Sequence, residues 1–195
     1  MPTSFGSRLN STFSKYGQLC VGIDPHASLL ADWGLSDDVA GLEKFANSVL
    51  DAAAGTVGII KPQVSFFERH GSKGFAVLEE LAQRASQTDL LVIMDAKRGD
   101  IGTTMDAYFD AWLGQNAPFI SDALTVSPYL GFGSLKDTLS GAVERGKGVF
   151  VLAATSNPEG ASVQRATIGE STLAKSMWDS LSEVNRVIME AHSRR

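Results

Sequence analysis

Short apolar runs recur along this chain, and each of them ends in polar or charged residues. The polar residues that end the five runs are Asp24, Lys61, Asp95 with Lys97, Ser127, and Thr155 with Ser156. The intervals between these positions are fairly even. The pattern predicts a series of short strands whose carboxyl ends carry the polar chemistry of the protein.

Helical patterns fill the intervals between the apolar runs. Near the N-terminus, Phe5, Leu9, Phe13 and Tyr16 recur at helical spacing. Further helical patterns cover residues 38–54, 73–85, 101–113, 134–144 and 171–192. We therefore expect an N-terminal helix over about residues 5–17, followed by strands that alternate with helices.

The alternation of apolar strands and helices predicts parallel βαβ units and thus an α/β protein. No GxGxxG motif follows the first apolar run, which weakens a Rossmann-type interpretation. Polar groups at the end of every strand favour instead the (β/α)8 TIM-barrel type, in which the active site lies on that rim.

The length of the chain does not suffice for a complete barrel of this type. Eight units need roughly 250 residues, whereas the chain has 195 residues. Five strands cannot close a barrel, and both outer strands would keep unpaired edges. We expect a single incomplete (β/α)-barrel domain over residues 1–195, with about the first five βα units of a protein truncated at its C-terminus. An open five-stranded sheet is the alternative.

The composition is that of an ordinary globular protein, with 44% hydrophobic and 20% charged residues and a formal net charge of -5. No run rich in Lys and Arg points to nucleic-acid binding. No apolar stretch approaches the roughly 20 residues of a membrane-spanning helix, and the N-terminus lacks the apolar segment of a signal peptide. We expect a cytoplasmic protein with no nucleic-acid or membrane partner, in which the single cysteine, Cys20, is a buried and inert thiol.

The third apolar run ends in a cluster of charges, Asp95-Ala-Lys97-Arg-Gly99-Asp100. Alternate residues of a strand point the same way, so Asp95 and Lys97 are expected on one side while Arg98 points away, toward the surface. Gly99 permits a sharp turn. Two structural interpretations stay open: Asp100 caps the next helix, or the Asp–Lys pair is a buried ion pair without a catalytic role.

Charged residues from two other strands are expected at the same rim. With Lys61 beside them, Asp95, Lys97 and Asp100 would form a group that alternates in sign, and Asp24 would lie nearby. Buried charges are costly unless they are paired, and stability alone seldom explains four of them in one place. Flanking carboxylates would keep Lys97 protonated against desolvation. A protonated lysine can deliver a proton to a developing carbanion, so the group suits a carbanion-forming decarboxylation.

Several segments resemble the orotidine 5'-phosphate decarboxylase family. DAKRGDIGTT, at residues 95–104, resembles the D-x-K-x-x-D signature of its longer bacterial branch. Its strand ends and loops are similar to IDPH, IIKPQ, TVSPYLG and ATSNPEG of this chain. The resemblance covers essentially the whole chain. It implies a (β/α)8 barrel that decarboxylates orotidine 5'-monophosphate to UMP in pyrimidine biosynthesis.

The resemblance also implies roles for individual residues. Lys97 would protonate C6 of the pyrimidine after carbon dioxide leaves, and Asp95 would lie against the departing carboxylate. Lys61 would complete the charged tetrad with Asp100, and Lys61 and Asp24 would hold ribose hydroxyls. Another residue, Ser156, would read the pyrimidine base.

The same resemblance implies a homodimer that uses no metal ion and no organic cofactor. Asp100, Ile101 and Thr104 would reach into the site of the neighbouring subunit. The histidines lack the spacing of metal ligands; they are His26, His70 and His192.

The chain departs from the family in its C-terminal part. Family members grip the substrate phosphate with a Gly-rich loop after the seventh strand and an Arg after the eighth, and no position here matches either segment. Remote phosphate contacts supply catalytic energy, so a protein ending at Arg195 is expected to be a poor enzyme. Two alternatives stay open: a magnesium-dependent sugar-phosphate decarboxylase of the 3-keto-gulonate 6-phosphate type, and a non-catalytic barrel fragment.

Overall fold

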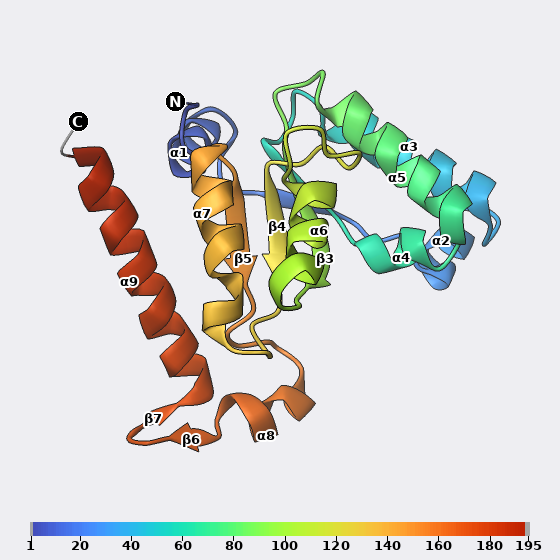
Figure 1. Ribbon diagram of the computed structural model, residues 1–195. Coiled ribbons are helices and arrows are strands. Elements are labelled where there is room, and N and C mark those ends of the chain that lie inside the picture. Colours follow the sequence, from blue (N-terminus) through green and yellow to red (C-terminus); the bar gives the residue numbers. More distant parts are fainter. Residues whose placement is uncertain (1, 194–195) are drawn as a thin grey trace.

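A five-stranded parallel sheet forms the centre of the molecule, with its strands in the order β1-β2-β3-β4-β5 (Figure 1). The computed structural model describes residues 2–193. The strands are β1 (Cys20–Ile23), β2 (Ile59–Pro62), β3 (Leu91–Arg98), β4 (Ala123–Val126) and β5 (Gly148–Val151). Each of them coincides with one of the predicted apolar runs. The α/β fold with about five βα units is therefore confirmed.

Helices connect the strands, and most of them agree with the predicted ranges within about three residues. The helices are α1 (Phe5–Tyr16), α2 (Ala27–Asp32), α3 (Val39–Ala53), α4 (Val64–Glu68), α5 (Gly71–Ala85), α6 (Gly102–Trp112), η1 (Phe132–Leu135), α7 (Lys136–Glu144), η2 (Pro158–Gly160), α8 (Ala161–Gln164) and α9 (Leu173–Ser193). The predicted start of the last helix at residue 171 is wrong, because residues 171–172 pair in a small hairpin. Its strands are β6 (Thr167–Ile168) and β7 (Ser171–Thr172).

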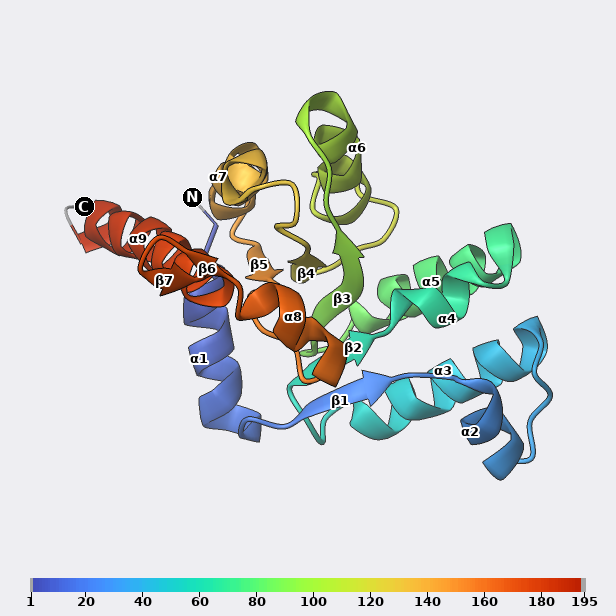
Figure 2. The same ribbon diagram turned by 90° about the horizontal axis from the view of Figure 1, so that it is seen from below.

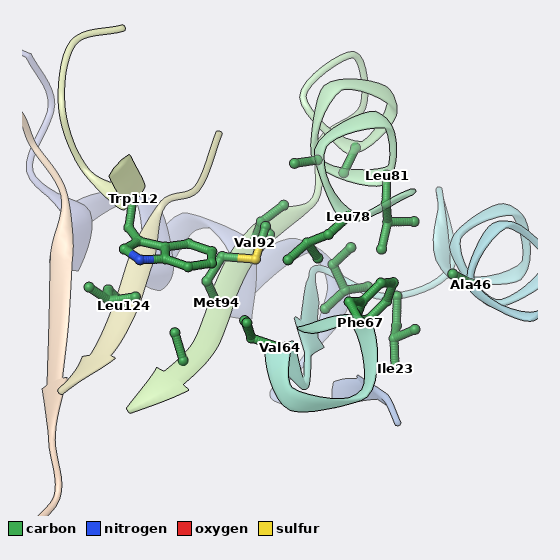
Figure 3. Close-up of a cluster of buried hydrophobic side chains, with 14 of the residues drawn as sticks. Ile23, Ala46, Val64, Phe67, Leu78, Leu81, Val92, Met94, Trp112 and Leu124 are labelled. Atoms are coloured by element: carbon green, nitrogen blue, oxygen red, sulfur yellow. The ribbon is translucent and has the colours of Figure 1, made fainter. Parts of the chain in front are cut away.

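The sheet is curved, and helices cover its outer face. Figure 2 looks onto the carboxyl ends of the strands, with α3, α5, α6 and α7 outside the arc of strands. The main core lies between these helices and the sheet. Figure 3 shows part of it, where Val92 and Met94 of β3 project among Phe67, Leu78 and Trp112. These side chains are less than a tenth exposed. Alternate residues of a strand face the same side, so the residues of each strand that face the helices are apolar.

The opposite parity of the strands forms a second, smaller cluster on the inner face. It consists of Ile59, Leu91, Ile93 and Ala123, with Phe5, Leu9 and Phe13 of α1 packed against it. Because α1 lies at the amino ends of the strands (Figure 1), it closes that end of the curved sheet. The carboxyl ends remain accessible on the inner face.

Helix α1 is held in place by caps and by one ion pair. Ser4 accepts a hydrogen bond from the backbone N–H of Ser7 at the start of the helix, and Gly17 ends it with a positive φ. Arg8 forms an ion pair with Asp122, which directly precedes β4. The other carboxylate oxygen of Asp122 accepts the N–H of Val92 at 2.8 Å. Asp122 thus joins α1 to two neighbouring strands.

The prediction that Cys20 is buried is wrong. The thiol is exposed, although its neighbours Val21 and Ile23 belong to the outer core or pack against it. Cys20 has the same parity as Gly22 and faces the inner side of β1, the first strand of the sheet. The apolar run in the sequence therefore did not show which face of β1 is covered by other residues and which face is open.

The arc of five strands remains open between residues 2 and 193, because β1 and β5 each have a strand neighbour on one side only. In that same range, no helix is both long and apolar enough to cross a membrane.

Replacing Gly148 by alanine is expected to loosen the contact between α1 and β5. The added Cβ would lie 2.4 Å from Cδ1 and 2.6 Å from Cε1 of Phe5, so the ring or the helix must shift. We expect the free energy of unfolding to fall by about 1–3 kcal/mol, as measured by urea denaturation of the purified chain.

Gly6→Ala is the matched control for this substitution. Gly6 lies in the same helix, and no heavy atom lies within 4 Å of the position that its Cβ would take. Alanine should leave the stability unchanged or raise it by about 0.5–1 kcal/mol. Equal stabilities of the two variants would show that α1 does not pack tightly on β5.

Candidate active site

The end of β3 departs from regular strand geometry at the charged cluster. The register between β3 and β4 shifts between Met94 and Arg98, as in a β-bulge. Within residues 2–193, Lys97 is the only non-glycine residue with a positive φ, at 48°. This conformation is costly for a residue with a side chain and recurs at functional sites. The bulge turns the backbone while keeping the Lys97 side chain beside Asp95.

Asp95 is the centre of the cluster. Its Oδ1 accepts hydrogen bonds from Nζ of Lys97 at 2.5 Å and from Oγ1 of Thr125 at 2.9 Å, and its Oδ2 accepts one from Nζ of Lys61 at 2.9 Å. The residue is only 8% exposed. Burial by itself raises the pKa of the carboxyl, but the hydrogen bonds from Lys97, Lys61 and Thr125 outweigh burial and lower that pKa below its usual value.

The two lysines carry one more charge than the carboxylate between them can balance. The side chain of Lys61 is 32% exposed and that of Lys97 is 44% exposed, so both ammonium groups are accessible from the open end of the sheet. Nζ of Lys97 also lies 3.4 Å from Oε1 of Gln63. The cluster therefore combines a fixed anion with two cations that can meet an anionic ligand.

Asp24 lies at the same end of the sheet but is not bonded to the lysines. The Cβ of an alanine at position 22 would lie 2.4 Å from Oδ2 of Asp24, so this carboxylate folds back over Gly22. Gly22 is the register partner of Lys61. Asp24 is thus near Lys61, and no hydrogen bond joins the two among the described residues.

Asp100 is not part of the cluster within one chain. Its Oδ1 accepts the N–H of Ile101 at 2.8 Å, and no ion pair joins it to Lys97 within the described residues. The expected tetrad is therefore not assembled here. The capping interpretation is also wrong, because the N-cap of α6 is Ile101, whose own side chain forms no capping hydrogen bond, and Asp100 precedes that position.

The path of the backbone after Lys97 explains why Asp100 lies outside the cluster. The positive φ angles fall on Lys97 and Gly102 rather than on Gly99, contrary to the expectation of a turn at Gly99. Gly99 is needed for space instead, since its Cβ would lie 2.4 Å from the carbonyl oxygen of Ser127. The chain therefore crosses the end of β4 before it reaches Asp100.

The other predicted binding residues lie outside the cluster. Ile101 is 62% exposed, and Thr104 is exposed in the first turn of α6. Ser156 is exposed in the loop after β5. Of the predicted site residues, the structure joins Lys61, Asp95 and Lys97 in direct contact.

The expectation that Arg98 stays at the surface is wrong. Its side chain is 20% exposed and pairs with Glu68 at 3.1 Å. The guanidinium lies 5.6 Å from the ring centroid of Tyr108 and 5.7 Å from that of Trp112. An arginine can bury its stem and stack on rings while it keeps an ion pair, so strand parity alone did not determine its exposure.

Two residues of the cluster, Thr125 and Gln63, were not predicted from the sequence. The sequence contained an indication for each of them. Thr125 is the one polar residue of the apolar run Ala123–Val126, and Gln63 follows Lys61 by two positions. A polar residue in an otherwise buried strand needs hydrogen-bond partners inside the protein. Strand parity places each of them on the side that carries the lysines.

The described side chains contain no group of three or more His, Cys, Asp or Glu residues arranged to hold a metal ion. The side chain of His192 lies outside the described residues. The expected absence of a metal and of an organic cofactor stays a prediction.

Comparison with protein families gives one match over most of the chain. The profile of the Orotidine 5'-phosphate decarboxylase / HUMPS family matches residues 17–191. A protein of Streptomyces coelicolor named Orotidine 5'-phosphate decarboxylase is 60% identical over 166 residues, which are 85% of this chain and 60% of that protein. A protein of the same name from Nocardioides sp. is 54% identical over 185 residues, 93% and 68% of the two chains.

Solved structures agree with these relatives. The crystal structure of a Streptomyces avermitilis protein, provisionally named orotidine 5'-phosphate decarboxylase, superposes with a TM-score of 0.92 at 55% identity and covers 94% of this chain and 65% of that one. Leishmania donovani OMP decarboxylase superposes with a TM-score of 0.72 at 31% identity, and the match covers 89% of this chain and 62% of that one. This chain thus spans about 60–68% of the length of these proteins.

The buried carboxylate of Asp95 should make the stability of the chain depend on pH. Because its pKa is lowered by folding, its contribution is fully present above the unfolded pKa of about 3.9 and is lost as the pH falls through the folded pKa. The chain should be about 1–3 kcal/mol more stable than Asp95→Asn at pH 7, and this difference should shrink below about pH 4. Denaturant unfolding over a pH series measures it.

Asp106→Asn serves as the control, since Asp106 is exposed on α6 and has no ion pair among the described residues. Its stability should follow that of the unmodified chain at every pH. A constant difference between the unmodified chain and Asp95→Asn from pH 7 to pH 3 would contradict the charged state assigned to Asp95.

Proposed function

Because this chain belongs to the orotidine 5'-phosphate decarboxylase / HUMPS family, we propose that its cluster of charges carries out the decarboxylation of orotidine 5'-monophosphate to UMP, a step of pyrimidine biosynthesis. The family resemblance that its motifs predicted is confirmed. The substrate and the reaction are inferred from relatives that are longer than this chain, and from the chemistry of the site.

One observation carries the proposal, which is the sharing of the buried Asp95 carboxylate by two lysine ammonium groups. Asp95 stays ionised, so a substrate carboxylate held beside it would be repelled in the bound state. Loss of carbon dioxide would relieve that repulsion as the transition state forms. The C6–carboxyl bond would break, its electron pair would stay on C6, and Lys97 would transfer a proton from Nζ to C6.

The remaining residues supply binding. Lys61 is accessible beside Asp95, and it would hold a ribose hydroxyl together with Asp24. Ser156 lies in the exposed loop after β5 and would contact the pyrimidine. Because positively charged side chains are in excess at the cluster, an anionic nucleotide would be attracted to this end of the sheet. No metal ion is needed for any of these steps, so a chelator should leave the reaction unchanged.

The described residues provide no counterpart for the phosphate ligands expected in the family. Among the described residues, no strand pairs with the outer edges of β1 and β5, so the sheet does not close around the site. Turnover by the 195-residue chain should therefore be slow, since phosphate contacts would not help to place the reacting end of the substrate. The same openness favours a second candidate, a domain that binds without catalysis.

We also propose that two copies of the chain associate through the loops that follow β3 and β4. Ile101, Tyr129 and Leu130 are 62%, 82% and 53% exposed, and they lie near the carboxyl ends of neighbouring strands. Large apolar side chains that gather on a surface often mark a protein interface. Asp100 is turned away from its own Lys97, as a residue that serves a neighbouring site together with Thr104 would be. No nucleic-acid partner is proposed, and a cytoplasmic location stays a prediction.

Replacing Lys97 by alanine should abolish proton delivery to the substrate. Carbon dioxide release from orotidine 5'-monophosphate should fall by at least about 100-fold relative to the unmodified chain. Lys175→Ala, an exposed lysine of α9 paired with Asp179, should retain the original rate. Near-normal turnover in Lys97→Ala would exclude the role given to Lys97, and no release above the uncatalysed rate by the unmodified chain would favour binding without catalysis.

Association should depend on the exposed loop residues. Ile101→Glu is expected to convert a dimer into a monomer in analytical ultracentrifugation, because it places a charge in an apolar contact. Leu19→Glu makes the same change at an exposed position near the opposite end of the sheet and should leave the dimer intact. A monomer at all concentrations of the unmodified chain would contradict the proposed association.

A further inference from the structure

We propose that Thr125 is a positioning residue that fixes the carboxylate of Asp95 and the backbone of Lys97 relative to each other. The proposal rests on the function proposed above, because it concerns the same cluster. Thr125 lies in β4, between β3 and β5, and takes no part in the chemistry itself. Its hydroxyl touches the two residues on which the reaction depends.

Thr125 is a polar residue at a place where water has little access. It is 8% exposed, and the other residues of β4, Ala123, Leu124 and Val126, are completely buried. A buried hydroxyl costs free energy unless it is hydrogen-bonded. Here it makes two bonds of 2.9 Å, one with Oδ1 of Asp95 and one with the backbone N of Lys97.

The directions of these two hydrogen bonds are determined by their partners. A backbone N–H can only donate, so the hydroxyl oxygen must accept from Lys97. An ionised carboxylate can only accept, so the single hydroxyl proton must go to Asp95. Thr125 therefore donates to the charged form of Asp95, which favours that form, and accepts the N–H of Lys97, which points toward β4.

The irregular end of β3 gives this contact its importance. The β3–β4 register breaks between Met94 and Arg98, and Lys97 has a φ of 48°. The ladder of backbone bonds is interrupted there, and the Thr125 side chain takes the place of a backbone acceptor for Lys97. A conformation that is costly for a lysine is thereby held by a side chain of the neighbouring strand.

The three groups form a closed ring of contacts. Lys97 is bound to Thr125 at its backbone N and to Oδ1 of Asp95 at its Nζ, and Thr125 binds the same Oδ1. Fixing both ends of the lysine limits where its ammonium can lie. Small displacements of a reacting group lower a rate strongly, so loss of this ring should affect turnover more than substrate binding.

Thr125→Val and Thr125→Ser separate the hydroxyl from the rest of the side chain. Valine keeps the shape and the branched Cβ but removes both hydrogen bonds, whereas serine keeps the hydroxyl. Thr138→Val is the matched control, since Thr138 is a buried threonine of α7 with 3% exposure outside the cluster. All three variants are made in the full 195-residue chain.

Two measurements do not require an active enzyme. Amide hydrogen exchange by NMR reports the bond from the N–H of Lys97, and a ¹³C titration of the Asp95 carboxyl reports its protonation. In Thr125→Val the Lys97 amide should exchange at least about 10-fold faster, and the Asp95 titration should move to higher pH because one bond to the charged form is lost. Thr125→Ser and Thr138→Val should resemble the unmodified chain.

The third measurement is carbon dioxide release from orotidine 5'-monophosphate. Thr125→Val should lower kcat by about 10- to 100-fold with a smaller change in KM, and Thr125→Ser should restore most of the loss. If the unmodified chain releases no carbon dioxide, the proposed function fails, while exchange and titration still test the positioning role.

Unchanged Lys97 exchange and Asp95 titration in Thr125→Val would overturn the proposal. Equal effects of valine and serine would also overturn it, because a loss that the serine hydroxyl does not restore cannot be assigned to the two hydrogen bonds of Thr125. Should Thr125→Val fail to fold, the unmodified chain decides, since a Lys97 amide that exchanges as fast as an exposed loop amide cannot be bonded to Thr125.

Discussion

The carboxylate of Asp95 accepts hydrogen bonds from side chains of three strands, Lys61 on β2, Lys97 on β3 and Thr125 on β4. Without this anion, two ammonium groups would lie close together with no charge between them. With it, the lysines are held at a defined place and still carry a net positive charge toward the open end of the sheet. The placement of both lysine ammonium groups and the proposed reaction depend on this one ionised group.

The two ends of the sheet serve different purposes. At the amino ends, α1 packs against an apolar inner cluster, and Gly148 leaves room for Phe5. Toward the carboxyl ends the inner face turns polar: two residues after the buried Ile59 and Ile93, the same strands carry Lys61 and Asp95. A parallel sheet brings like ends of strands together. The inward-facing residues of these strands therefore form an apolar cluster at the amino ends and the charged cluster at the carboxyl ends.

Much of this arrangement could be predicted from the sequence, because apolar runs, helical spacing and strand ends depend on local patterns. The contact of Lys61 and Lys97 with Asp95 follows from strand parity and parallel order. The exposure of Cys20, the position of Asp100 outside the cluster and the partial burial of Arg98 could not be predicted in this way. They depend on which face of a strand is covered and on the bulge at the end of β3, and both are set by tertiary packing.

The place of α1 has a practical consequence. Its first turn lies at the amino ends of the strands, on the side of the molecule away from the charged cluster (Figure 1). An affinity tag or a surface linker joined ahead of Ser4 would emerge there. Immobilised through that segment, the protein would present its lysines to the solution, so ligand binding could be followed on a sensor surface without obstruction.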